Sequence, residues 1–243
     1  MTKTRGNRTV VATPRHARFV RITHWLTTIA FVALLVSGIE VVLSHPRFYW
    51  GEVGNINTTP LFTIPVPSSR ETVPTGYGFV LPDQNGWSRY LHFQAAWLAL
   101  FTGFVYVVAG LRTGHFRRNL VPETADRSWR ALSTTITEHL RFATSAFGDP
   151  LSYNALQRIS YLVVIFVLFP LLIWTGLAMA PGFTAVFPWS VHSLGGRQSA
   201  RTLHLVVTIA LVFFTVVHVT MIILAGFRSR VRAMVTGAAE KQL

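Results

Sequence analysis

The sequence predicts an all-α membrane protein in which four transmembrane helices form a bundle. Hydrophobic residues make up 51% of the 243-residue chain, more than is usual for a water-soluble domain. Four apolar segments are each long enough to cross the ~30 Å hydrocarbon core of a bilayer as a helix. These segments are 22–43, 90–111, 159–180 and 203–227. We expect them to form one membrane domain that includes the whole chain, 1–243.

The distribution of basic residues predicts how this bundle is oriented. The segments 1–21, 112–158 and 228–243 hold 17 of the 22 lysines and arginines. Because basic residues are enriched in cytoplasmic segments, both termini and the loop 112–158 are predicted to be cytoplasmic. The net charge of +13 is then explained by topology, and it does not indicate a nucleic-acid-binding protein.

The first apolar segment, 22–43, is too long for the hydrophobic part of a signal peptide, so it is expected to remain as a helix. His24 lies just inside this segment, and Gly38 follows fourteen residues later on nearly the same helix face. The outer loop 44–86 contains six prolines, which exclude a helix of any length. Its stretch LFTIPVP has the composition of a β-strand.

The second apolar segment, 90–111, has His92 near its start, and Gly103 falls on the same side of the helix. In the loop that follows, residues 128–147 carry apolar side chains at helical spacing, which predicts an amphipathic helix along the cytoplasmic membrane surface. The third segment, 159–180, has Pro170 in its middle, so a kink is expected. A short loop, 181–200, leads to the fourth segment.

The fourth segment contains two histidines, His204 and His218, fourteen residues apart. Their side chains share one helix face and lie roughly 21 Å apart along the axis. The predicted topology places His92 and His204 near the outer surface, and His24 and His218 near the inner surface. Two level pairs result, and paired histidines on facing helices of a bundle are typical axial ligands of haem iron.

The sequence therefore predicts two b-type haems, an outer one held by His92 and His204 and an inner one held by His24 and His218. The chain has no cysteine, which excludes covalent c-type attachment and cysteine-ligated iron–sulfur clusters. For any single histidine, a hydrogen bond between two helices is the alternative interpretation.

Other residues are candidates for secondary roles around these haems. Gly38, Gly103 and Gly176 would leave room for a flat macrocycle, although glycine also helps membrane helices to pack. Arginines can pair with haem propionates, or anchor the chain to lipid headgroups. The candidates are Arg89, Arg197 and Arg201 at the outer level and Arg18, Arg21 and Arg158 at the inner level. Glu40 is either a proton relay or an acid that extends to the membrane surface.

Several motifs resemble those of a known family. The motif RITHW in the first segment, a histidine at the start of the second and H-x13-H in the fourth resemble the bacterial cytochrome b561 superfamily. That superfamily includes the membrane subunits of formate dehydrogenase and nickel–iron hydrogenase. The segments HPRFYWGE, GHFRRNL and GGRQSARTLH look most like the thiosulfate-reductase-type cytochrome b subunits.

The resemblance implies a di-haem cytochrome b in the bacterial inner membrane, with axial ligands at the positions of the four paired histidines. Such a protein passes electrons between a redox partner subunit, often a periplasmic molybdopterin enzyme, and the quinone pool of a respiratory-type chain. Candidate quinone-site residues are His16, Arg117 and His139 near the inner haem and Glu40 near the outer one. The long outer loop favours docking of a partner or a cap over the outer haem, and a quinone or oxidant site in this loop is a further alternative.

Two alternatives stay open from the sequence. A stand-alone superoxide:quinone oxidoreductase, which smaller members of the superfamily resemble, would need no partner subunit. A haem-free transporter would use the histidines as proton relays, although transporters are usually larger and built from repeats, and no internal repeat is apparent.

Overall fold

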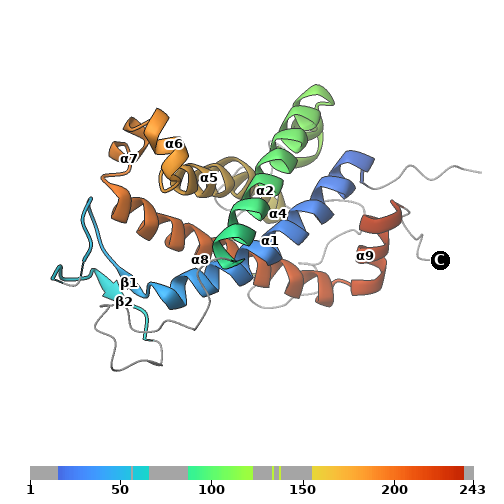
Figure 1. Cartoon of the computed structure of the whole chain (residues 1–243). Coiled ribbons are helices and arrows are strands. Elements are labelled where there is room, and N and C mark those ends of the chain that lie inside the picture. Colours follow the sequence, from blue (N-terminus) through green and yellow to red (C-terminus); the bar gives the residue numbers. More distant parts are fainter. Residues whose placement is uncertain are drawn as a thin grey trace, which may run out of the picture.

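Four long apolar helices dominate the computed structural model, which describes residues 16–55, 57–65, 87–122, 133, 137 and 155–237. They are α1 (Arg18–Ser44), α2 (Trp87–Arg112), the span Leu156–Leu177 and α8 (Arg197–Leu224). Each is long and apolar enough to cross a membrane. Helix α1 packs against α2, and α5 (Phe169–Leu177) packs against α8, so the bundle consists of two helical hairpins (Figure 1). The predicted four-helix fold is confirmed.

The third span is not a uniform α-helix. It begins as α4 (Ala155–Val163), widens into the π-helical turn η4 (Val164–Leu168), and continues as α5. Pro170 is in the first turn of α5. Proline lacks the N–H that an α-helix needs, and its ring clashes with the carbonyl four residues earlier. The π turn lies directly before this proline, in the part of the span where the sequence predicts a kink.

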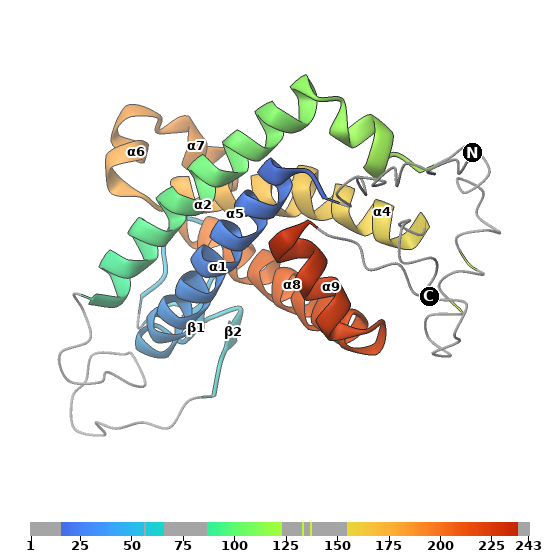
Figure 2. The same cartoon turned by 90° about the vertical axis from the view of Figure 1, so that its right-hand side faces the viewer.

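Two connections differ from the sequence prediction. Part of the segment expected to be a loop forms the short helices α6 (Pro181–Val186) and α7 (Trp189–His192). Helix α8 ends at Leu224, because Gly226 adopts the left-handed conformation with φ of 98°. The chain then turns into α9 (Phe227–Thr236), which ties back to α1 through a hydrogen bond of 2.7 Å from Arg21 Nη1 to the Val235 carbonyl. Figure 2 shows α9 beside the start of α1.

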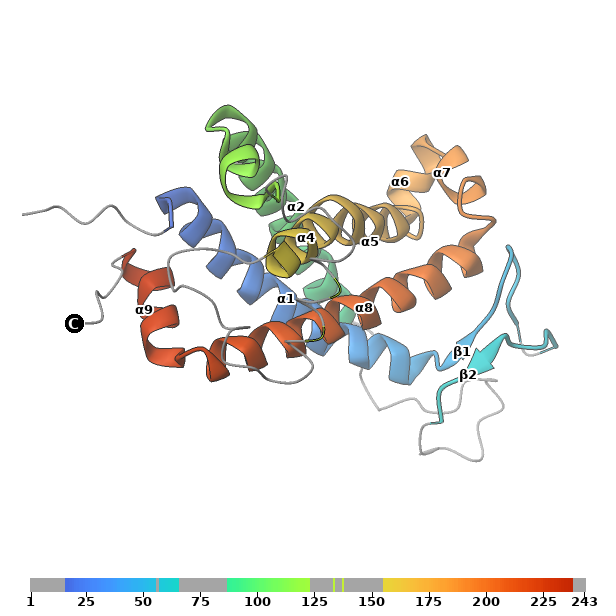
Figure 3. The ribbon, with the colours of Figure 1, turned by 180° about the vertical axis from the view of Figure 1, so that it is seen from behind.

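A small hairpin follows α1. Strand β1 (Arg47–Phe48) pairs antiparallel with β2 (Phe62–Thr63), where β2 falls inside the stretch expected to be strand-like. We call residues 45–55 and 57–65 the β1–β2 segment. It lies against the start of α8 (Figure 3).

Hydrogen bonds hold the β1–β2 segment on the first turns of α8. The Gly51 carbonyl accepts from the backbone N–H groups of Gln198 (3.0 Å) and Ser199 (3.2 Å). The Ser199 hydroxyl accepts from the Gly51 N–H at 2.7 Å, and Thr202 Oγ1 donates to the Tyr49 carbonyl at 2.7 Å. These bonds satisfy N–H groups at the start of a helix, which have no partner within it.

The two hairpins also meet in the middle of the bundle. Val164, Val207 and Leu211 form a buried apolar cluster, and Phe31 of α1 packs against it from the other hairpin. Val207 and Leu211 lie on α8 between His204 and His218. Apolar packing therefore separates the two histidine levels of that helix.

Two sequence predictions fall outside the described residues. Apart from Ser133 and Thr137, the structure does not describe the predicted amphipathic helix 128–147. His139 is in the same region. Both stay predictions.

Substitution of Gly196 by alanine should destabilise the protein. Gly196 has φ of 116°, and a Cβ there would collide with the backbone of Gly51 and Glu52. Non-glycine residues in such conformations cost about 1–3 kcal/mol, so the melting temperature in detergent should fall by several degrees. Gly182→Ala is the matched control, because a Cβ at Gly182 meets nothing within 4 Å. Equal melting temperatures for the two variants would contradict this account.

Candidate functional site

The structure brings the four predicted histidines together as two pairs. The ring centroids of His92 (α2) and His204 (α8) are 6.3 Å apart, with the ring planes at 60°. Those of His24 (α1) and His218 (α8) are 6.4 Å apart, with the planes at 51°. Helix α8 thus supplies one histidine to each pair, and the α1–α2 hairpin supplies the other.

This spacing suits two imidazoles on opposite sides of one metal ion. A ring nitrogen binds a first-row metal at about 2.0–2.1 Å and lies about 1.1 Å from the centre of its own ring, so trans imidazoles place their centres about 6.3 Å apart. The described residues contain no group of three or more His, Asp or Glu that would enclose a free metal ion. The donor set is two nitrogens per site, which suits a metal whose other positions are filled by a macrocycle.

Hydroxyl groups contact both rings of the His92–His204 pair. Ser37 Oγ lies 3.0 Å from His92 Nδ1, and Thr175 Oγ1 lies 2.9 Å from His204 Nδ1. Each hydroxyl comes from the other helix of its hairpin, Ser37 from α1 and Thr175 from α5. The rings are therefore oriented by their hairpin neighbours.

Glycines beside these hydroxyls make room for the rings. A Cβ on Gly38 would lie 3.6 Å from His92 Cε1, and one on Gly176 would lie 3.4 Å from His204 Cε1. Any larger side chain would push against the imidazoles. At Gly103 a Cβ meets nothing within 4 Å, so open space adjoins that position.

The His24–His218 pair has a different surrounding. Phe214 stacks on His218 with centroids 5.7 Å apart, and Tyr161 meets it edge-on at 6.1 Å. Within the described part of the chain, the buried atoms His24 Nδ1 and Arg21 Nε have no hydrogen-bond partner. Buried polar groups without partners are rare in proteins. Two of them three residues apart on α1 indicate a site for a polar or charged group that the described residues do not provide.

The candidate propionate arginines are in varied settings. Arg201 donates to the carbonyls of Arg47 (3.1 Å) and His45, and its guanidinium lies 4.5 Å from the centre of the Phe48 ring. Arg158 Nη1 donates to the Val121 carbonyl at 3.2 Å. Arg197 is 3.8 Å from Glu52 in an exposed ion pair.

The other three candidates are at the starts of the first two spans. Arg89 is exposed in the first turn of α2, and Arg18 is exposed at the start of α1. Arg21 combines the bond to Val235 described above with its buried, unpartnered Nε. Of the six arginines, it is the one that the structure leaves with a buried donor to satisfy.

Two histidines outside the pairs, His45 and His115, are half-buried. His45 follows α1 beside Arg201, and burial together with the positive charges of Arg201 and Arg89 lowers its pKa. His115 lies among aromatic rings, with Phe19 at 5.5 Å and Phe116 at 5.8 Å between centroids. Burial and the nearby Arg118 lower the pKa of His115, so both histidines favour the neutral form.

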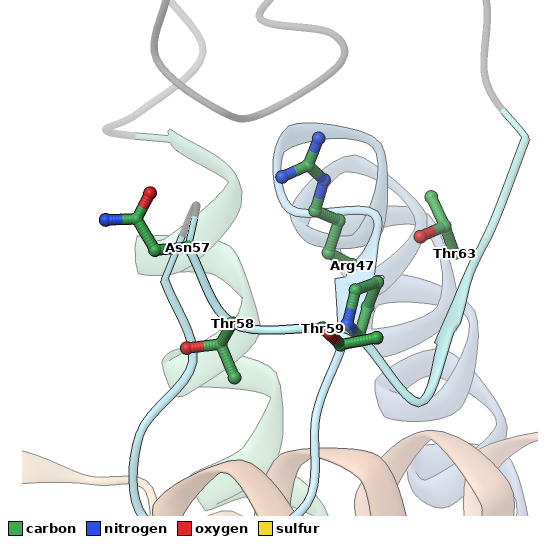
Figure 4. Close-up of a pocket in the computed structure, with 6 residues that line it drawn as sticks. Arg47, Asn57, Thr58, Thr59 and Thr63 are labelled. Atoms are coloured by element: carbon green, nitrogen blue, oxygen red, sulfur yellow. The ribbon is translucent and has the colours of Figure 1, made fainter.

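The remaining candidates are not brought to the histidine pairs by any described contact. Glu40 is half-buried on α1, His16 precedes that helix, and Arg117 is exposed in the π-helical turn η1 (Phe116–Leu120). A hollow of about 400 Å³ in the β1–β2 segment is lined by Arg47 and the polar turn that includes Asn57 and Thr58 (Figure 4). Its lining is polar and contains no histidine, so it is separate from the paired sites.

Sequence reasoning missed Ser37 and Thr175. Each directly precedes one of the glycines singled out in the sequence, so the chain contains Ser37-Gly38 and Thr175-Gly176. A hydroxyl residue followed by glycine in an otherwise apolar helix is the one sequence signal for these two residues. Which ring each would face depends on helix packing.

Comparisons with known proteins identify the family of the chain. The family model described as prokaryotic cytochrome b561 matches residues 15–237. The chain belongs to this family. It is also 29% identical, over 86% of its own length and 90% of the relative's, to a putative protein-methionine-sulfoxide reductase subunit, YedZ1, of Azospira oryzae. No solved structure matches the chain.

Membership of the prokaryotic cytochrome b561 family implies b-type haem and electron transfer in a membrane. The residues present fit such a group. Both pairs of imidazoles have the spacing that two axial ligands require, and Gly38 and Gly176 leave room beside the rings of His92 and His204. The unpartnered Arg21 Nε suits a propionate carboxylate.

Leucine at Gly38 or Gly176 should lower the b-type haem content per chain, because the side chain would displace the ring of His92 or His204. Alanine should be tolerated at Gly38, where the added Cβ makes an ordinary contact. A pyridine haemochrome count on purified protein measures this content, and Gly182→Leu in α6 is the control. Full haem content in both leucine variants would contradict the proposed crowding.

Proposed function

We propose that the protein is a di-haem electron-transfer subunit that passes electrons between a redox partner and the quinone pool. The observation that carries the proposal is the presence of two histidine pairs with similar centroid spacings, 6.3 and 6.4 Å, each with one histidine on α8. In this proposal His92 and His204 ligate one haem b, and His24 and His218 ligate the other.

The two sites are fixed relative to each other by α8. Fourteen residues separate its two histidines, which is roughly 21 Å along a helix axis. Bound haem supplies a one-electron iron couple at each level. The chain contributes the ligands, a fixed distance and an apolar layer of Val207, Leu211 and Phe31 between the levels, which keeps water away from the path.

The proposed orientation follows from the basic segments. Both termini are cytoplasmic, which places the His24–His218 pair at the inner surface and the His92–His204 pair at the outer surface of the bacterial inner membrane. The start of α1 and helix α9 lie at the same end of the bundle, as an even number of spans requires.

The proposed partner is a redox protein on the outer side, of the kind that contains a molybdopterin cofactor. Support comes from the relative in Azospira oryzae, whose name describes a subunit of a protein-methionine-sulfoxide reductase. The β1–β2 segment covers the outer end of α8 and would form part of the docking surface. The word subunit in the name of this relative favours a function with a partner over a stand-alone superoxide:quinone oxidoreductase.

Replacement of each histidine by alanine should give paired losses. His92→Ala and His204→Ala should remove the same spectral component, and His24→Ala and His218→Ala should remove the other. The reason is that a bis-imidazole site needs both of its ligands. Reduced-minus-oxidised spectra with a pyridine haemochrome count measure the outcome, and two b haems per chain are expected in the wild type.

His192→Ala is the control, since this histidine is exposed in α7 and belongs to neither pair. Loss of the same component in His92→Ala and His218→Ala would overturn the pairing. A haem-free wild-type protein would overturn the function.

A further inference from the structure

We infer that Ser37 and Thr175 are positioning residues that fix the ring tautomer of His92 and His204 and lower the reduction potential of the haem that this pair binds. The inference rests on the proposed function, because it concerns the ligands of one of the two proposed haems. It assigns to two neutral residues of α1 and α5 a role that neither family membership nor the sequence motifs give them.

The first step concerns the single hydrogen of each hydroxyl. Ser37 Oγ donates to the Ala33 carbonyl of its own helix at 2.7 Å. Thr175 Oγ1 donates to the Leu171 carbonyl at 2.8 Å. A hydroxyl has one donor and two acceptor lone pairs, so both oxygens present only acceptor capacity to the facing imidazole.

The tautomer of each histidine follows from this. With the hydroxyl hydrogens donated to the helix carbonyls, the oxygens 3.0 Å from His92 Nδ1 and 2.9 Å from His204 Nδ1 favour the ring hydrogen on Nδ1. The lone pair of a neutral imidazole is then on Nε2. Both rings are thereby prepared to bind iron through Nε2 before the haem arrives.

The second step concerns the electronic effect on a bound metal. A hydrogen bond donated by the outer nitrogen of a ligating histidine raises the basicity of the nitrogen that binds the metal. Stronger donation stabilises ferric over ferrous iron, and hydrogen bonding around the ligands is one of the ways in which proteins set haem potentials. Both axial ligands of the His92–His204 site have this bond.

The His24–His218 pair provides the contrast. His24 Nδ1 is buried and has no hydrogen-bond partner among the described residues. His218 packs against the aromatic rings of Phe214 and Tyr161. The contribution of Ser37 and Thr175 therefore acts on the haem of the His92–His204 pair.

The same arrangement occurs once in each hairpin. A hydroxyl residue followed by glycine lies on the first helix of the hairpin, and the glycine leaves space for the histidine of the second helix. The hydroxyl fixes the ring direction while the glycine removes the side chain that would block it. Two independent occurrences of this arrangement at one site argue against chance contact.

The experiment is a redox titration of wild type, Thr175→Val and Ser37→Ala, followed in the α-band. Each variant should shift the oxidised-to-reduced ratio of the His92–His204 component toward the reduced form by about threefold to tenfold. This corresponds to a potential about 28 to 59 mV higher for a one-electron couple. The other component should not move, and the low-spin ferric electron paramagnetic resonance signal of the shifted haem should change with it.

Thr208→Val is the matched control. The Thr208 hydroxyl donates to the His204 carbonyl at 2.8 Å, so this variant also loses a hydroxyl bonded to the fourth preceding carbonyl, but not one that faces a ring nitrogen. Thr175→Ser keeps the hydroxyl and should restore the wild-type potential. Ser37→Ala acts on the other ligand, His92. It therefore tests the inference even if Thr175→Val lowers the haem content.

The inference is overturned if Thr175→Val and Ser37→Ala titrate like Thr208→Val, or if Thr175→Ser behaves like Thr175→Val. Assignment of the two components comes from His92→Ala and His24→Ala. A wild-type protein that lacks two b-type components would overturn the proposed function instead, so the two failures are distinguishable.

Discussion

The arrangement of this bundle depends on the need to bury four imidazole rings in an apolar environment. Ionisable side chains inside a membrane are costly unless they face a partner or a cofactor. Here each ring faces another across the boundary between two hairpins, with 6.3 Å between the centres of His92 and His204. The hairpins meet where α4 contacts η1, where β1 contacts α8, and in the middle of the bundle, where Phe31 packs against Val207 and Leu211.

Small local features serve this arrangement. Gly38 and Gly176 leave space at the rings, and Ser37 and Thr175 supply oxygens whose own hydrogens are used within their helices. The π turn before Pro170 lets the third span continue to Thr175 after a residue that cannot donate its N–H. Each feature is an irregularity in an apolar helix. Together they fix the ring orientations of His92 and His204.

The fold and the histidine pairs could be predicted because both depend on simple periodicities. Segment length and apolarity gave the four helices, and the spacing of His204 and His218 on one helix, with the alternating direction of the spans, gave the pairs. The contacts of Ser37 and Thr175 could not be predicted, because they depend on how each hairpin is rotated about its axis. The hydrogen bonds of Arg201 to the His45 and Arg47 carbonyls depend on the path of a loop, which composition does not determine. The helices α6, α7 and α9 were missed because short polar or proline-flanked stretches have too few turns to show a period.

The attachment of the β1–β2 segment to α8 has a mechanical consequence. Thr202 holds the Tyr49 carbonyl at 2.7 Å, two residues before His204, and Ser199 and Gln198 hold Gly51 one turn earlier. A force applied to this segment reaches the ligand helix through a few short bonds and no flexible linker. A displacement of the β1–β2 segment would therefore also move the first turns of α8, and with them the imidazole of His204.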